Sequence, residues 1–204
     1  MASQGEFYAY FRIYDKIMND FYVALGANLP LGGMTPRDTL NAAIDAMRQQ
    51  NMAIHAVSAF YRTPCFPAGA GPDYVNAALH LKSALSSKDM LSQLHEIEAT
   101  HGRERQERWG MRTLDLDLIA CGDSVLPDLP TFKHWHALPA ALQRQEAPTE
   151  LILPHPRLQD RAFVLVPLRD IAADWRHPVL NLTVTEMCNA LAPEALAEIV
   201  VLEA

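Results

Sequence analysis

Residues 113–118 read Thr113-Leu114-Asp115-Leu116-Asp117-Leu118, which alternates leucine with polar side chains. Successive side chains of a β-strand point to opposite faces of its sheet, so this alternation predicts a strand, which we extend to Ala120. The leucines then face a hydrophobic core. Thr113, Asp115 and Asp117 share the opposite face, where the Cα atoms of the two acids stand about 7 Å apart.

The segments before this strand are predicted to alternate between strands and helices. Thr35 followed by Pro36 marks a helix start, because threonine caps free N–H groups and proline fits the first helical position. In chain order we predict a strand at 21–25, a helix at 36–50, strands at 54–61 and 74–81, a helix at 87–101 and the strand at 113–120. This β-α-β-β-α-β order is typical of the ferredoxin-like fold, an α+β architecture with helices packed on an antiparallel sheet.

The remainder of the chain is predicted to be less regular. Residues 122–150 contain four prolines and show little periodicity, so we predict a long surface loop with one helical turn at 140–145. A firmer pattern resumes at 151–168, and Thr183 with Glu186 forms a capping box that starts a short helix ending near Leu191. We predict a single domain at 21–204. Residues 1–20 form an extension of unknown role, either a docking segment or the result of a start upstream of Met18.

The composition is that of a globular protein and disfavours several classes of partner. No apolar run approaches the roughly 20 residues that a membrane helix needs. The formal net charge of -7 disfavours nucleic acid, which binds basic surfaces. Cys65, Cys121 and Cys188 form no closely spaced pair, so we interpret them as small buried side chains in a reducing compartment. We expect a cytoplasmic monomer without nucleic-acid or membrane partners.

The carboxylates of Asp115 and Asp117 are the candidate metal ligands. Unpaired and side by side they would repel each other, and one would resist ionisation. A divalent cation removes this repulsion, and an all-oxygen site without histidine or cysteine favours magnesium over zinc. For so short a pattern, an exposed strand whose acids pair with nearby arginines remains open as the alternative.

Four arginines stand directly before the acidic strand and are the candidate phosphate ligands: Arg103, Arg105, Arg108 and Arg112. Arginine makes forked contacts with phosphate oxygens, so an arginine-rich loop beside a metal site suits a magnesium–polyphosphate ligand. The sequence has no glycine-rich phosphate loop of the P-loop or Rossmann type, so side chains must hold the phosphates. Glu104 and Glu107 leave open the alternative of a solvated loop that neutralises itself.

The segment 102–117, Gly-Arg-x-Arg-x-x-Arg-Trp-Gly-x-Arg-Thr-Leu-Asp-Leu-Asp, resembles the signature of the 6-hydroxymethyl-7,8-dihydropterin pyrophosphokinases, enzymes of folate biosynthesis. Further stretches agree in order and spacing: 24–29, then 61–64 with 72–77, then 154–155 with Arg161 and Phe163. The resemblance covers 21–191, nearly the whole chain. It implies that the substrate's hydroxymethyl oxygen attacks the β-phosphorus of ATP, so that diphosphate is transferred and AMP leaves.

The resemblance also implies a role for each matching residue. Asp115 and Asp117 bind two magnesium ions, and Arg103 and Arg112 act on the phosphates during the chemical step. ATP is the co-substrate, and its other expected contacts are Glu98, Arg105, Trp109, His155 and Arg161. The pterin is expected to contact Gly26, Thr63, Pro64, Phe66, Tyr74, Asn76, Trp109 and Phe163. The residues that depart from the family pattern are Phe66, Met111 and Pro156.

The chemistry of these side chains agrees with the implied roles. Phosphoryl transfer needs positioning and charge neutralisation more than covalent help, and two metal ions clamp the attacking and leaving oxygens. A flat pterin ring packs against aromatic faces such as those of Tyr74 and Phe163, and the carboxamide of Asn76 matches the donors and acceptors at its edge. The alternative is a ferredoxin-like module that binds a nucleotide without turnover.

Overall fold

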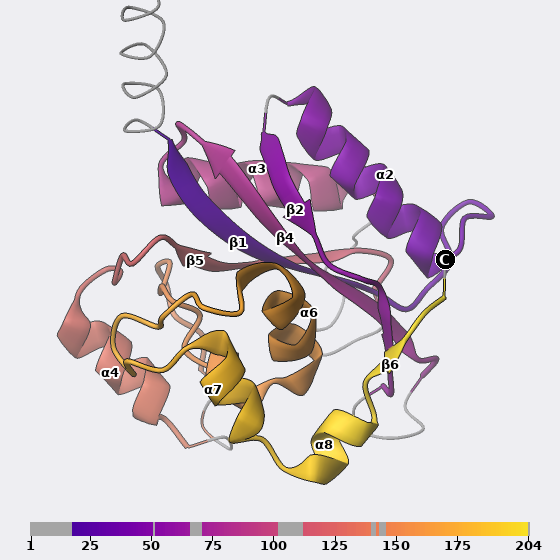
Figure 1. Cartoon of the computed structure of the whole chain (residues 1–204). Coiled ribbons are helices and arrows are strands. Elements are labelled where there is room, and N and C mark those ends of the chain that lie inside the picture. The colour runs from indigo at the N-terminus through magenta and orange to yellow at the C-terminus, as the bar shows by residue number, and fades with distance from the viewer. Residues whose placement is uncertain are drawn as a thin grey trace, which may run out of the picture.

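The computed structural model describes residues 18–50, 52–65, 71–101, 112–139, 142 and 146–203. In chain order its elements are β1 (Asn19–Ala27), α2 (Pro36–Gln49), β2 (Ala53–Val57), β3 (Tyr61–Thr63), β4 (Tyr74–Ser83), α3 (Ser87–Thr100), β5 (Asp115–Cys121), α4 (Leu129–Ala137), the 3-10 helix η1 (Leu158–Asp160), α6 (Ala162–Ala172), α7 (Val184–Asn189), α8 (Pro193–Ala197) and β6 (Val200–Val201). Helices lie on both sides of the sheet (Figure 1).

An antiparallel sheet forms the middle layer of the molecule (Figure 1). Its strand order is β5-β1-β4-β3-β6, and β2 pairs with β4 farther along that strand than β3 does. β1 therefore lies between β4 and β5 and pairs with both. This order confirms the predicted ferredoxin-like β-α-β-β-α-β core.

The predicted strand at 54–61 is wrong in its continuity, because it is divided into β2 and β3. The break falls at Ser58, whose hydroxyl oxygen accepts a hydrogen bond from the backbone N–H of Ala78 at 2.8 Å. A side-chain oxygen thus replaces the usual backbone acceptor in the ladder. The next N–H, that of Ala59, turns away from the sheet and donates to the carboxylate of Asp170 on α6 at 3.2 Å.

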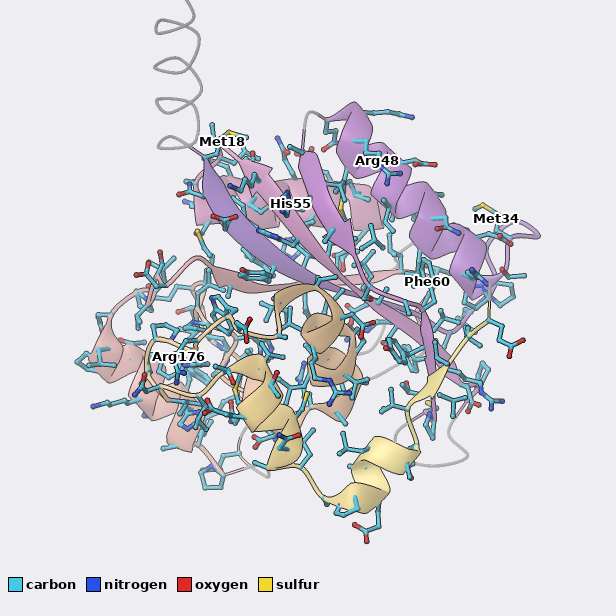
Figure 2. The ribbon with its side chains drawn as sticks, in the orientation of Figure 1. Met18, Met34, Arg48, His55, Phe60 and Arg176 are labelled. Atoms are coloured by element: carbon cyan, nitrogen blue, oxygen red, sulfur yellow. The ribbon has the colours of Figure 1, made fainter. Side chains whose placement is uncertain are left out.

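Alternation along the strands divides the core between the two faces of the sheet. On one face, Phe21, Val23 and Leu25 of β1 pack with the buried sides of α2 and α3. On the other, Tyr22 and Ala24 belong to a second apolar cluster with α6 and α7. Side chains fill the space between the sheet and the helices on both sides (Figure 2). The second helical layer adds to the predicted fold, which had helices on one face.

The helices begin where the sequence predicts capping. At α2, the Thr35 hydroxyl accepts from the N–H of Asp38, whose carboxylate accepts from the N–H of Thr35. Thr183 and Glu186 form the same capping box at α7. These reciprocal bonds satisfy N–H groups that have no partner within the helix. The predicted helices at 36–50, 87–101 and 183–191 are therefore confirmed to within a residue or two at each end.

The predicted loop at 122–150 is wrong in part, because it contains helix α4. The Asp128 carboxylate caps α4 by accepting from the N–H of Thr131 at 2.8 Å, and Pro130 stands in the first turn. Phe132 anchors the helix, since its side chain is fully buried. The predicted turn at 140–145 lies largely outside the described residues.

The amino-terminal boundary is also slightly displaced from its predicted place. β1 begins at Asn19, two residues before the predicted strand, because Asn19 and Asp20 continue the pairing with Ser83 and Lys82 of β4. Residues 1–17 lie outside the described part of the chain, so their role stays a prediction. No helix among the described residues has the length and apolar character that crossing a membrane requires.

Candidate active site

A row of small and polar side chains crosses the face of the sheet that α6 covers. The pairing register places Asp115 of β5 opposite Gly26 of β1, and Gly26 opposite Asn76 of β4. Asp117 stands opposite Ala24 in the next row on the same face. The leucines between the acids face the other way: Leu114, Leu116 and Leu118 are 0 to 4 % exposed in the core under α2 and α3. The predicted division of this strand into a leucine face and an acidic face is confirmed.

Each of the two acids faces a different arginine. Arg112 donates from its guanidinium to Oδ1 of Asp115, three residues away. Arg161, at the start of α6, places Nη1 at 3.6 Å from Oδ2 of Asp117. The pairing of acids with arginines that the sequence left open is thus present in the structure. It brings together at one place the candidate metal ligands and two of the candidate phosphate ligands.

Burial and charge act differently on the two arginines. Burial acts to lower the pKa of Arg112, but the nearby carboxylates of Asp115 and Asp117 outweigh it and the pKa is raised. For Arg161 burial prevails, so its pKa is lowered in spite of Asp117. The carboxylate of Asp117 only partly offsets the cost of burying the positive charge of Arg161. A bound anion would stabilise that charge further. Arg161 is therefore a suitable ligand for a phosphate oxygen.

Asn28 fixes the backbone of Arg112 and was not singled out from the sequence. It is 2 % exposed and follows β1 directly. Its Oδ1 accepts from the N–H of Arg112 at 2.9 Å, and its own N–H donates to the Arg112 carbonyl at 3.0 Å. Its Nδ2 donates to the carbonyl of Pro72, just before β4, at 3.1 Å. Asn28 lies within the stretch 24–29 that carries the family resemblance, which is the one signal that pointed to it.

His155 lies in the segment between β5 and α6, beside Arg161. Its backbone N–H donates to the carbonyl of Ile119 in β5 at 2.7 Å. Its ring Nδ1 accepts from the N–H of Arg157 at 3.1 Å, so in the neutral ring the proton is on Nε2. Burial and the positive charges of Arg161 and Arg157 hold the pKa of His155 well below its usual value. The neutral ring therefore offers one N–H donor, at Nε2.

Glu98 reaches β5 from helix α3. Its carboxylate is buried, and Oε1 accepts from the backbone N–H of Leu116 at 2.7 Å. This contact places Glu98 against the strand that carries the two acids. Its expected contact with the nucleoside stays a prediction.

The residues expected to contact the pterin gather around Asn76. The Asn76 amide donates to the hydroxyl of Thr63 on β3 at 2.7 Å, and both side chains are buried. A Cβ atom at Gly26 would lie 3.0 Å from Oδ1 of Asn76 and 3.8 Å from the ring of Tyr74. Gly26 therefore leaves room for the Asn76 oxygen beside Tyr74, whose hydroxyl has a pKa raised by burial.

Phe163 connects the two groups of candidate residues. It stands in the first turn of α6, where the residue is 39 % exposed. The guanidinium carbon of Arg161 lies 5.8 Å from the centre of this ring, within the range of a cation–π contact. An exposed aromatic face next to the arginine suits a flat ring bound beside a phosphate. Pro64 is exposed directly after Thr63.

Several predicted site residues lie outside the described part of the chain: Phe66, Arg103, Arg105, Arg108, Trp109 and Met111. Their assignments stay predictions. The described site residues come from separate places in the sequence: β1, the end of β3 and the residue after it, β4, α3, the segment before β5, β5 itself, the segment before α6 and the first turn of α6.

Comparison with protein families gives a match over residues 22–173 to 7,8-dihydro-6-hydroxymethylpterin-pyrophosphokinase (HPPK). The chain is 32% identical over 179 residues to the Haemophilus influenzae 2-amino-4-hydroxy-6-hydroxymethyldihydropteridine pyrophosphokinase, a match that covers 87% of this chain and 96% of that protein. It is 39% identical over 158 residues to the protein of the same name from Pseudomonas aeruginosa, covering 77% and 83% of the two chains.

Solved structures with the same fold include that of the Plasmodium falciparum HPPK-DHPS, wild type. The superposition has a TM-score of 0.59 at 14% identity and covers 84% of this chain. This chain spans 44% of the length of that one. At this identity the likeness shows the fold alone.

Proposed function

Because the chain belongs to the 7,8-dihydro-6-hydroxymethylpterin-pyrophosphokinase family, we propose that it transfers diphosphate from ATP to the hydroxymethyl group of 6-hydroxymethyl-7,8-dihydropterin. One observation carries the proposal. The acids Asp115 and Asp117 lie on the same face of the sheet as Asn76, and Gly26, which has no side chain, stands between Asp115 and Asn76 in the pairing register. A phosphate site and a site for a polar ring edge are thus adjacent.

The carboxylates of Asp115 and Asp117 fit two magnesium ions. Magnesium is held in proteins by one or two carboxylates together with substrate phosphates and waters, so a larger protein cage is not needed. The described residues agree with this, since they contain no cluster of three or more acidic, histidine or cysteine ligands. When bound by these two carboxylates, magnesium would supply positive charge against the triphosphate.

The arginines supply the remaining positive charge. Arg112 is held by Asn28 through its backbone, which leaves its guanidinium to approach the ligand from the side of Asp115. Arg161 approaches from the side of Asp117. Because arginine donors are planar and fixed, they bind phosphate oxygens with defined geometry and lose little side-chain entropy for each bond. The neutral His155 adds a donor at Nε2 on the side of Arg161.

The pterin contacts follow from the chemistry around Asn76. Thr63 holds the amide nitrogen of Asn76, which leaves the amide oxygen, on the side of Gly26, to accept an N–H of the ring edge when the pterin binds. Tyr74 and Phe163 supply aromatic faces for the ring. We propose that the ring's substituent points toward Asp115, which lies in the same row of the sheet as Asn76. We also propose that Phe66 and Trp109 complete the ring site, and that Arg103, Arg105 and Glu98 complete the ATP site.

The reaction then proceeds by displacement at phosphorus. The hydroxymethyl oxygen forms a bond to the β-phosphorus and loses its proton, while the bond from the β-phosphorus to the oxygen that bridges it to the α-phosphorus breaks. AMP leaves with that oxygen. The contribution of the chain is to align the two oxygens and to neutralise the charge between them, which is what such transfers require.

Product analysis tests this proposal. The chain, incubated with Mg-ATP and the dihydropterin alcohol, is expected to form AMP and a diphosphorylated pterin. Asp117→Asn should abolish turnover and leave the fold intact, whereas Asp123→Asn, an exposed acid just beyond β5, should leave the rate unchanged. Formation of ADP or free phosphate, or binding of ATP with no turnover, contradicts the proposal. The latter result would favour the non-catalytic nucleotide-binding module.

A further inference from the structure

Helix α4 supplies none of the proposed substrate contacts, yet one of its side chains reaches the segment that holds His155. The ring Nδ1 of His136 lies 3.3 Å from the carbonyl oxygen of Pro156. A carbonyl oxygen only accepts hydrogen bonds, so Nδ1 of His136 must carry a proton in this contact. Pro156 stands directly between His155 and Arg157.

The position of His136 is fixed by the packing of α4. The ring of Phe132 is fully buried and stacks on the ring of His136, with centroids 5.6 Å apart and planes 13° apart. Phe132 also packs at 5.6 Å against His177, which is fully buried as well. One helical turn thus connects an anchor in the interior to a donor at the active-site segment. Figure 1 shows α4 on the same side of the sheet as α6 and α7.

The contact acts on a single peptide group, the one that joins Pro156 to Arg157. Its carbonyl oxygen accepts from His136, and its N–H donates to Nδ1 of His155 at 3.1 Å. The peptide group is planar, so its carbonyl and its N–H turn together. Any rotation that breaks the bond to His136 also withdraws the N–H from the imidazole of His155.

We propose that His136 is a positioning residue for His155, which it orients through the Pro156–Arg157 peptide group so that Nε2–H of His155 faces the nucleotide phosphates. This inference rests on the proposed function, because the nucleotide contact of His155 belongs to it. Without the bond to Arg157, Nδ1 of His155 can take the proton, and the donor at Nε2 is lost. The histidine of α4 thus selects the tautomer of the histidine in the site.

A second donor reaches the same carbonyl oxygen. Nε2 of Gln159 lies 3.3 Å from it. Loss of His136 alone should therefore weaken the orientation of the Pro156–Arg157 peptide group but not abolish it. Loss of both donors, His136 and Gln159, should abolish it. The expected effect of His136→Ala is a rise of about fivefold in the KM for ATP, the size of one ordinary hydrogen bond. The KM for the pterin should stay within about twofold, because no contact of His136 reaches Asn76.

Two conservative replacements separate geometry from packing. The amide nitrogen of asparagine takes nearly the position of Nδ1 in histidine, whereas that of glutamine matches Nε2. His136→Asn should therefore restore a low KM for ATP, and His136→Gln should not. His134→Ala is the matched control, because this histidine is exposed on the same helix and its ring contact is with its neighbour Trp135.

Nitrogen-15 NMR of the histidine rings at neutral pH gives a readout that does not depend on ATP. We expect His155 to be protonated at Nε2 alone in the parent chain and in His136→Asn, and to be a mixture of tautomers in His136→Ala and in the double variant with Gln159→Ala. An unchanged His155 signal in both of these variants overturns the proposal, as does equal rescue by asparagine and glutamine. If His136→Ala does not fold, the comparison of asparagine with glutamine decides. If His155→Ala leaves the KM for ATP unchanged while the tautomer still depends on His136, the nucleotide role of His155 fails and its positioning stands.

Discussion

Asn28 and Arg112 bond to each other in both directions. The N–H of Arg112 donates to the side-chain oxygen of Asn28 at 2.9 Å, and the N–H of Asn28 donates to the carbonyl of Arg112 at 3.0 Å. The same carboxamide also donates to Pro72. One buried side chain therefore joins the end of β1 to Arg112, three residues before the acidic strand β5, and to Pro72, two residues before β4. The phosphate side and the pterin side of the site are aligned through it.

Asn28→Ala should damage both sides of the site at once. It removes two partly buried hydrogen bonds, to the N–H of Arg112 and the carbonyl of Pro72, which costs about 2 kcal/mol in the free energy of unfolding. We expect kcat to fall at least about tenfold and the KM to rise for both substrates, because misplacing a catalytic group slightly has large effects on rate. Urea unfolding and steady-state kinetics measure the two effects.

Asn19→Ala provides the matched control for Asn28. The Asn19 side chain also donates to a backbone carbonyl, that of Leu85 at 2.9 Å, but in an exposed position at the other end of β1. Its kinetic constants should equal those of the parent chain. If Asn28→Ala retains its full rate, the carboxamide does not align the site.

Gly26→Ala should affect the pterin selectively. The added methyl group would stand 3.0 Å from Oδ1 of Asn76, closer than such contacts normally allow, so the amide must shift. We expect the KM for the pterin to rise by about tenfold or more, the loss of one well-placed hydrogen bond to a polar ring edge. The KM for ATP is the internal control, measured at saturating pterin. A rise in both constants by the same factor would point to a general disturbance of the sheet.

Magnesium binding should depend on Asp115 as well as on Asp117. Asp115→Asn removes one carboxylate charge, and we expect the magnesium concentration that gives half-maximal activity to rise by about tenfold or more. Calorimetric titration of magnesium, with a non-hydrolysable ATP analogue present, measures the same change without turnover. Asp123→Asn serves again as the exposed control. An unaltered magnesium dependence in Asp115→Asn removes this residue from the metal site.

The buried His177 should make the fold sensitive to mild acid. Burial and the nearby His136 lower its pKa from 6.5 to about 4, so the folded state favours the neutral ring. The contribution of His177 to the free energy of unfolding is fully present above pH 6.5 and is lost as the pH falls toward about 4. In this range the unfolded chain binds a proton at this histidine and the folded chain does not. The loss amounts to about 3 kcal/mol at the acid end of this window.

Urea unfolding across this pH range checks the expectation. Nδ1 of His177 accepts from the N–H groups of Val179 and Leu180 at 3.1 and 3.2 Å, and the oxygen of asparagine can replace it there. His177→Asn should therefore fold and show a smaller decrease in stability between neutral pH and pH 4 than the parent chain. The remaining slope reports other groups, among them His155, whose lowered pKa acts in the same direction. An unaltered slope would exclude His177 as a source.

Patterns with a short period made the core of the fold predictable. Leucine alternation located β5 and its acidic face, and Thr35 with Pro36 located the start of α2, because these signals depend on neighbouring residues alone. β6 escaped prediction because it is two residues long and exists through pairing with β3, far away in the sequence. The break at Ser58 escaped for a similar reason, since its hydroxyl replaces a backbone group that only the folded sheet brings near.

The candidate site followed the same division. The spacing of Asp115 and Asp117 was enough to predict them as candidate metal ligands. The family resemblance supplied the roles of residues such as Asn76 and Arg161. Asn28 and His136 were not assigned roles, because each acts by holding another residue's backbone. Such a contact joins segments that are far apart in sequence, and a single sequence contains no pattern that records it. Asp128 followed by Pro130 is a pattern that predicts the start of α4. It was missed because the proline-rich segment around it was predicted to be a loop.

The contact between Glu98 and Leu116 has a consequence for how copies of this chain meet one another. β5 ends the strand order of the described sheet, and a strand in that place presents N–H and carbonyl groups to which a foreign strand can attach. The N–H of Leu116 is already bonded to a buried carboxylate from α3. A neighbouring molecule cannot extend the sheet at this point without first displacing that carboxylate from the interior. The contact thus protects the edge strand β5 against edge-to-edge aggregation.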